Sequence, residues 1–234
     1  MEINISVAKI NKYASPESGD TVEVIERPNG GLSVVMADGQ SSGRGAKQIS
    51  NLVVRKVITL LSEGVRDGAA ARAASDSLFT ERKGKVSSTL NIISVDMQTS
   101  TLVITRNNPS PVVICSANQV SQLDEECNPI GLYRDTRPLI SEIPLEAGLT
   151  VIMFTDGLVH AGTRYGEAMD FLTCLQVMFE DDTPAANTIA DSLLAGAMQL
   201  DEGRPVDDIS VVVLQVSSHE GDNVRRMTVR LPLA

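Results

Sequence analysis

The chain has 234 residues, of which 42% are hydrophobic, 21% charged and 3% aromatic, with no Trp. This composition is typical of a globular protein with a mainly aliphatic core, and it excludes collagen-like, disordered and disulfide-scaffold classes. Thirty Asp and Glu residues against twenty Lys and Arg residues give a formal net charge of −10. That charge disfavours nonspecific electrostatic binding of nucleic acid and leaves room for metal sites.

Cysteine usage and the start of the chain bear on its compartment. Cys115, Cys127 and Cys174 are widely spaced and only two histidines accompany them, so we expect neither a structural zinc site nor a disulfide framework. No basic segment followed by a long apolar stretch opens the sequence, and the longest apolar runs, such as 151–154, have about four residues. We therefore expect a reduced, cytoplasmic protein whose partners include neither nucleic acid nor a membrane.

Strand-like and helix-like patterns alternate in blocks, and no repeat, low-complexity tract or long linker divides them. We therefore expect one domain over residues 1–234. In the first third of the chain, apolar residues alternate with polar ones or recur at helical spacing. The elements expected there, in chain order, are strands at 3–7, from Asp20 and at 32–37, a helix from Ala46 to a stop at Gly64, and a helix at 67–82.

The rest of the chain continues with a meander of short strands separated by turn-rich pieces. Further strands are expected at 89–96, 101–106, 112–116, 119–123 and 149–155, helices at 167–179 and 183–200, and two closing strands at 209–216 and 224–231. Strands in runs followed by helices in pairs favour a layered α+β domain over a parallel α/β sheet.

Four acidic residues lie at the ends of predicted strands. Asp38 and Asp156 each follow a strand and precede Gly, Asp207 comes just before a strand, and Asp20 begins one. Residues so far apart in sequence can converge at one rim of a sheet, where clustered carboxylates repel one another unless a divalent cation neutralises them. Oxygen ligands alone favour Mg²⁺ or Mn²⁺ over zinc.

Each Asp-Gly pair also has a plainer interpretation as a turn with a solvated acid. If that holds, the chain is an unrelated α+β domain and its acids lie scattered in space. The joint pattern favours the metal site, because Asp38 and Asp156 follow unusually apolar strands, with the sequences VVMA and VIMFT.

Seven short pieces of sequence carry a resemblance to a known family. They are Ser18-Gly19-Asp20; Met36-Ala37-Asp38-Gly39 followed by Gly43-Arg44-Gly45-Ala46; Ser88-Thr89-Leu90; Arg106-Asn107-Asn108-Pro109-Ser110-Pro111; Pro129-Ile130-Gly131-Leu132; Phe154-Thr155-Asp156-Gly157; and Asp207-Asp208-Ile209-Ser210. In their order and approximate spacing they resemble the metal-dependent protein phosphatases (PPM, type 2C), in the SpoIIE-like bacterial branch that includes RsbU and RsbX.

The resemblance implies a fold and an activity. The fold would be a β-sandwich of two antiparallel sheets flanked by antiparallel helix pairs. The activity would be hydrolysis of phosphoserine or phosphothreonine by a water that two Mn²⁺ or Mg²⁺ ions activate. The implied partner is a phosphoprotein substrate, which in this branch is often a partner-switching regulator such as an anti-sigma-factor antagonist of the STAS type.

The resemblance also assigns roles to residues. Asp38 resembles the carboxylate that bridges the two metal ions, and the Gly39 carbonyl resembles a ligand of one of them. Asp156 and Asp207 resemble further metal ligands. Asp20 resembles an acid that binds directly or through metal-held water.

The segment Gly43-Arg44-Gly45 opens a predicted helix, where backbone N–H groups and the helix dipole can hold a substrate phosphate. Two interpretations of Arg44 remain open: a charge-assisted contact with the phosphate, and a solvated position on the surface.

The chain departs from the family pattern in ways that bear on catalysis. The wider family has a histidine near the bridging aspartate and an N-terminal arginine that clamps the phosphate, and no Arg precedes Arg27 here. Gly43-Arg44-Gly45 and Asn107-Asn108-Pro109 stand where the branch has Gly-His-Gly and Gly-His-Pro. The general acid is therefore unassigned, and a catalytically weak or inactive phosphatase-like binding module is the alternative.

Overall fold

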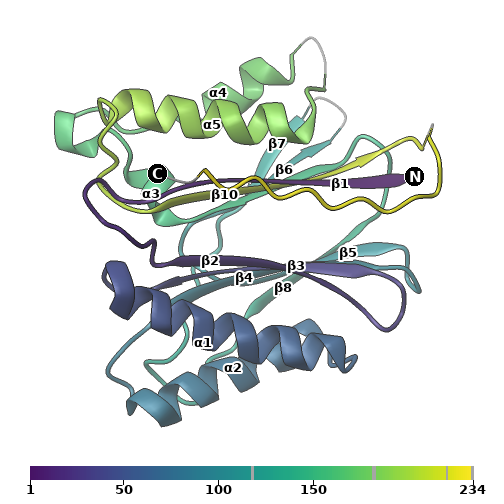
Figure 1. Ribbon diagram of the computed structural model, residues 1–234. Helices are drawn as coiled ribbons and strands as arrows, with labels where there is room; N and C mark the ends of the chain where they lie inside the picture. The colour runs from purple at the N-terminus through teal and green to yellow at the C-terminus, as the bar shows by residue number, and fades with distance from the viewer. Residues whose placement is uncertain (117–118, 181–182, 220, 233–234) are drawn as a thin grey trace.

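Two antiparallel sheets lie face to face between two layers of helices (Figure 1) in the computed structural model, which describes residues 1–116, 119–180, 183–219 and 221–232. In spatial order, the first sheet contains β1 (Glu2–Ile10), β10 (Ile209–Ser217), β9 (Thr150–Phe154), β6 (Val112–Ser116) and β7 (Gln119–Leu123). The second sheet contains β2 (Asp20–Glu26), β3 (Leu32–Gly39), β4 (Ser88–Asp96), β5 (Thr101–Asn107) and β8 (Leu139–Pro144).

Each sheet is covered on its outer face by helices. The second sheet carries α1 (Gly43–Ser62) and α2 (Asp67–Arg82), and the first carries α4 (Phe171–Met178) and α5 (Ala186–Leu200). A short helix, α3 (Asp156–His160), and a 3₁₀ turn (Thr163–Tyr165) connect β9 to α4. The layered α+β architecture expected from the sequence is confirmed.

Three apolar clusters fill the layers, one between the sheets and one under each helix pair. Strand β3 shows how the sequence builds two of them, because successive side chains of a strand point to opposite faces. Val34 and Met36 pack between the sheets, whereas Val35 and Ala37 pack under α1 and α2. A strand buried on both faces needs a continuous apolar run, which explains the segment VVMA.

Several elements begin or end where the sequence predicts, and others do not. Helix α2 has the predicted bounds, whereas α1 begins three residues earlier than expected, at Gly43. Helix α4 begins at Phe171 rather than at 167, because the Asp170 side chain accepts a hydrogen bond from the Thr173 backbone N–H (3.0 Å) and so caps the helix. Helix α5 begins at Ala186 rather than at 183.

The predicted closing strand at 224–231 is wrong, since the structure describes no strand there. Its apolar residues are exposed, with Met227 at 74% and Val229 at 84% of full exposure. Strand β10 already lies between β1 and β9, so the segment that follows cannot pair with it as a hairpin. Edge strand β8, with alternating half-buried and exposed residues, was not predicted.

Over the described ranges, no helix is long and apolar enough to cross a membrane.

Candidate metal-binding active site

Asp20 and Asp38 lie opposite each other on neighbouring strands. The antiparallel pairing of β2 with β3 puts the first residue of β2 against the next-to-last residue of β3. Asp20 is fully buried and Asp38 is half-buried. Strand register alone therefore brings two carboxyl groups together at one end of the sandwich, the end at which α3 also lies (Figure 1).

Hydroxyl groups from the other sheet hold the Asp20 side chain. Thr155 Oγ1 and Ser210 Oγ donate hydrogen bonds to Asp20 Oδ2, at 3.0 and 2.6 Å. The second oxygen, Oδ1, is buried without a hydrogen-bond partner among the described residues. A buried carboxylate oxygen with no donor is costly, so this atom is suited to a bound proton or a cation.

Asp156 and Asp207 reach the same place from the first sheet. Asp156 is the first residue of α3, two residues after the end of β9, and Asp207 lies two residues before β10. Because β9 and β10 are antiparallel neighbours, the end of one lies beside the start of the other. Asp38, Asp156 and Asp207 line one cavity of about 420 Å³, referred to below as the acid cavity.

The pKa values show that these carboxyl groups repel one another. The pKa of Asp38 is raised to about 9, first by burial and then by the charges of Asp20, Asp156 and Asp207. Burial also raises the pKa of Asp20, against the hydrogen bond from Ser210 and the charge of Lys9. For Asp207, burial and the charge of Asp156 raise the pKa. The charges therefore interact across the two sheets.

Neither Asp-Gly pair is a turn. Asp38 and Gly39 are the last residues of β3, and Asp156 and Gly157 open α3. A Cβ on Gly39 would collide with the Ala46 carbonyl oxygen, and one on Gly157 with the Asp208 carbonyl oxygen. Glycine is thus required by close backbone approach, which packs α1 and the start of β10 against the site.

The donor set fits a hard divalent cation. The groups available are carboxylates and the Gly39 carbonyl, and oxygen is the ligand atom that Mg²⁺ and Mn²⁺ prefer. The unpartnered Asp20 Oδ1 and the raised pKa of Asp38 both indicate missing positive charge. Within the described ranges, no three Asp, Glu, His or Cys side chains already enclose an ion, so the carboxylates would have to turn toward one.

Comparison with known proteins places this architecture in a family. The family model described as Stage II sporulation protein E (SpoIIE) matches residues 28–217. The chain belongs to the SpoIIE family. SpoIIE of Bacillus subtilis (strain 168) is 25% identical over 214 residues, and that of Priestia megaterium is 22% identical over 214 residues. Each match covers 92% of this chain, but only 26% and 36% of the respective relatives, so the chain spans about a third of their length or less.

Solved structures show that the SpoIIE-family chain has the PP2C phosphatase fold. The PP2C phosphatase domain of Bacillus subtilis SpoIIE, solved with a fragment of its regulatory domain, has a TM-score of 0.79 at 24% identity, covering 92% of this chain and 64% of that one. RsbX in complex with magnesium has a TM-score of 0.71 at 16% identity, with 92% and 96% covered. The catalytic domain of the serine/threonine protein phosphatase PstP, in complex with two manganese ions, has a TM-score of 0.68 at 16% identity, with 92% and 99% covered.

The predicted phosphate segment of this SpoIIE-family chain does not line the acid cavity. The wall on that side is formed by Gln40, Ser41 and Ser42. Arg44 is exposed, as its solvated interpretation predicts, and Gly45 lines a neighbouring cavity. His160, four residues after Asp156, has its Nδ1 3.9 Å from Asp156 Oδ2.

Three residues near the site were not singled out from the sequence. Lys9 Nζ and Lys47 Nζ both donate to the Asp20 carbonyl oxygen, at 2.5 and 2.7 Å. Lys12 is the one positively charged residue among the described residues that line the acid cavity, and its charge lowers the pKa of Asp207. The sequence signal was weak, since lysines are common surface residues.

Asp207 and Asp208 are adjacent but differ in environment. Asp207 faces the cavity, whereas Asp208 is buried and accepts backbone hydrogen bonds from Lys12 (2.9 Å) and Gly19 (2.8 Å). Asp208 therefore ties the loop before β2 to the start of β10. Asn108 likewise braces the scaffold, because its Nδ2 donates to the Phe154 carbonyl oxygen (3.3 Å).

Proposed function

We propose that this SpoIIE-family chain is a metal-dependent protein serine/threonine phosphatase, a phosphoric monoester hydrolase. The observation that supports this most directly is the set of four carboxyl groups that two sheets bring to one end of the sandwich, with the pKa of Asp38 raised to about 9. Four carboxylates match the charge of two divalent cations. Without cations, the same arrangement is repulsive and serves no evident structural purpose.

In the proposed site, Asp38 would serve as a ligand of both ions, and the Gly39 carbonyl, Asp156 and Asp207 would hold them further. Asp20 binds directly or through water, with its carboxylate oriented by Thr155 and Ser210. Two Mn²⁺ or Mg²⁺ ions would supply a water of lowered pKa and polarise the phosphoryl group for in-line attack, so no protein nucleophile is required.

The protein's own groups position the substrate. Lys12 brings a positive charge to a cavity otherwise lined by acidic and neutral residues, and it is suited to a phosphate oxygen. Ser41, Ser42 and Ser87 provide neutral hydrogen-bonding groups on the cavity wall. Such a wall orients a phosphorylated side chain without adding negative charge.

We further propose that the substrate is a cytoplasmic partner-switching regulator phosphorylated on Ser or Thr, such as an anti-sigma-factor antagonist of the STAS type. This rests on the family membership and on a structural neighbour that consists of the RsbU and RsbW domains of Rv1364c from Mycobacterium tuberculosis (TM-score 0.71, 15% identity). The alternative is a phosphatase-like binding module. It is favoured by Arg44 and Asn108, which stand where the branch has histidines.

Hydrolysis of p-nitrophenyl phosphate with Mn²⁺, with Mg²⁺ and with a chelator tests the proposal. We expect turnover that requires metal, is lost in Asp38→Asn and is retained in Asp191→Asn, which makes the same change on an exposed face of α5. A folded protein without activity in either metal would favour the binding module.

A further inference from the structure

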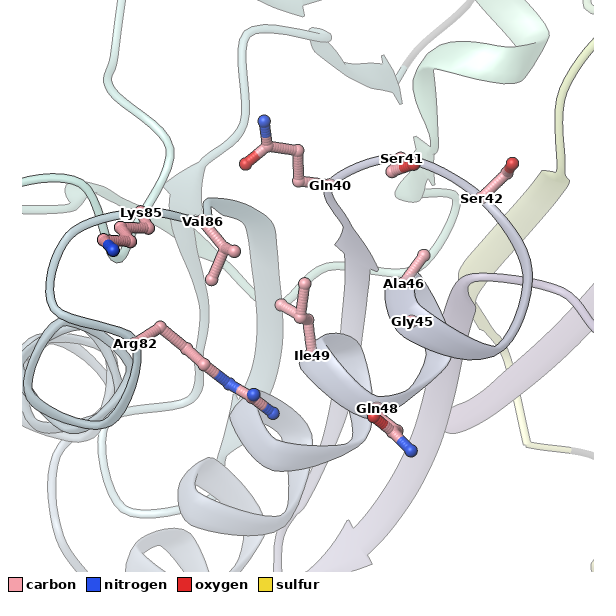
Figure 2. Close-up of a pocket in the computed structure, with 10 residues that line it drawn as sticks. All are labelled: Gln40, Ser41, Ser42, Gly45, Ala46, Gln48, Ile49, Arg82, Lys85 and Val86. Atoms are coloured by element: carbon pink, nitrogen blue, oxygen red, sulfur yellow. The ribbon is translucent and has the colours of Figure 1, made fainter.

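A second cavity adjoins the acid cavity and shares a wall with it. The shared wall is Gln40, Ser41 and Ser42, which line both cavities. The second cavity, of about 380 Å³, lies between the first turns of α1 and the loop that follows α2, and it is called the basic groove below. Figure 2 shows Arg82 extending from the end of α2 toward α1, with Ile49 and Val86 lying between these elements.

The basic groove carries positive charge in an acidic protein. Arg82-Lys83-Gly84-Lys85 places three cations within four residues of a chain whose net charge is −10. Arg82 and Lys85 both line the groove. A concentration of cations beside a cavity, against the charge of the whole chain, selects an anionic occupant.

Arg82 has hydrogen-bonding capacity that the described residues do not use. Its Nε is buried without a hydrogen-bond partner, and the nearby carboxylate of Glu81 is 3.7 Å from Nη2. The side chain as a whole is 38% exposed, so the guanidinium group remains open to a ligand. A carboxylate would satisfy two guanidinium donors at once, which is the geometry that arginine recognises best.

Backbone hydrogen bonds fix the conformation of the loop that carries Arg82 and Lys85. Lys83 (φ 57°) and Gly84 (φ 68°) are both left-handed, and the Gly84 N–H donates to the Phe79 carbonyl oxygen, ending α2. The Lys85 N–H donates to the Arg82 carbonyl oxygen (3.2 Å). Arg82 and Lys85 are thus presented by a fixed turn, which lowers the entropic cost of binding.

We propose that the basic groove is a substrate subsite that binds an Asp or Glu side chain near the phosphorylated residue. This rests on the proposed function, because the phosphorylated residue would occupy the acid cavity. Gln40, Ser41 and Ser42 line both cavities, so an extended peptide, at roughly 3.3–3.6 Å per residue, reaches from one cavity to the other within a few residues. The groove therefore selects a carboxylate within a few positions of the phosphoserine or phosphothreonine.

The test uses phosphothreonine peptides that carry a single Glu at each position from three before to three after the phosphorylated residue, each compared with its Gln counterpart. The readout is the ratio of kcat/KM for the Glu peptide to that for the Gln peptide. At the preferred position we expect a ratio of about five, typical of a partly exposed ion pair. Arg82→Gln should bring the ratio close to one. Arg72→Gln removes the same charge from an exposed position on α2 outside the groove and should leave the ratio unchanged.

The outcomes separate the subsite from the proposed function. Ratios of one at every position in wild-type protein, or a ratio that Arg82→Gln leaves intact, overturn the subsite even when p-nitrophenyl phosphate is hydrolysed. If no substrate is hydrolysed, the proposed function fails. Fluorescence anisotropy with the same labelled peptides then decides the subsite alone. Tighter binding of the Glu peptide that is lost in Arg82→Gln supports it, and equal binding of both peptides contradicts it.

Discussion

The two sheets each contribute two of the four site carboxyl groups but hold them differently. In the second sheet, Asp20 and Asp38 are paired by strand register, so neither backbone can move without breaking the ladder. In the first sheet, Asp156 and Asp207 lie just outside the strands, at the start of a short helix and in a loop. The exposed fraction of the Asp156 side chain is 42%, whereas Asp20 is fully buried.

Because the two pairs of acids are held differently, they have different roles in the proposed site. The paired acids form a fixed position with unfavourable charge, because burial raises the pKa of both Asp20 and Asp38 and the charge of Asp20 raises that of Asp38 further. The loop acids are freer to turn toward an ion. In the proposed metal site, one rigid pair and one adjustable pair would fix where the ions bind and still adapt to Mn²⁺ or Mg²⁺.

The largest expected effect is on kcat, and it should differ between the rigid pair, Asp20 and Asp38, and the adjustable pair, Asp156 and Asp207. Asp38→Asn should lower kcat by about a thousand-fold or more at any metal concentration, since it removes the shared ligand. Asp207→Asn should cost about ten- to a hundred-fold and recover as Mn²⁺ is raised. Steady-state kinetics across a Mn²⁺ titration measures both. A loss in Asp207→Asn that no metal concentration restores would contradict the division of tasks.

A smaller effect concerns stability without metal. The pKa of Asp38 is about 9 in the folded protein against 3.8 for an ordinary Asp, so the folded state binds the proton more tightly. Its contribution to stability is therefore complete below about pH 4 and is lost as the pH rises toward 9. In chelator, Tm should fall between pH 5 and pH 9 by about 5 °C, and Mn²⁺ should restore it at high pH.

Thermal unfolding of two variants checks whether Asp38 causes the dependence of Tm on pH in chelator. Asp38→Asn should flatten the dependence of Tm on pH in chelator and raise Tm at pH 8, because the repelling charge is gone. Asp191→Asn should keep the slope of the wild-type protein. An unchanged slope in Asp38→Asn would show that other groups carry the effect.

The smallest effect tests the hydroxyl groups that join the two sheets at Asp20. Ser210→Ala removes the 2.6 Å hydrogen bond to Asp20 Oδ2 and should raise the pKa of that carboxyl further. We expect Mn²⁺ affinity, measured by titration calorimetry, to fall about ten-fold. Ser121→Ala, on an exposed position of β7, is the matched control. Equal affinities in both variants would mean that Asp20 needs no orientation from the first sheet.

Much of the scaffold could be predicted because it depends on local patterns. The continuous apolar run of β3 and the helical period of α2 each indicate directly which side chains are buried. The four acids could be noticed because strand ends are visible in the sequence. The strand predicted at 224–231 failed because alternation describes a side-chain pattern and not the availability of a partner edge.

Contacts between distant elements account for what the sequence did not reveal. Nothing local distinguishes Asp207, which faces the cavity, from Asp208, which accepts backbone hydrogen bonds from the loop before β2. Arg82 and Lys85 resemble ordinary helix-ending cations, and only the packing of α1 beside them makes a groove. Lys12 likewise lines the acid cavity only because distant strands come together next to its loop.

The pairing of β1 with β10 has a consequence for how the protein folds. Glu2 lies opposite Ser217, so the first sheet closes a very long loop, whereas β2 to β5 join sequential neighbours and can form early. During synthesis, Asp20 and Asp38 can meet long before β10 leaves the ribosome. Asp207 arrives only with β10, so the site is completed in the last step of folding. A nascent or truncated chain without β10 would therefore lack one of the four site carboxyl groups.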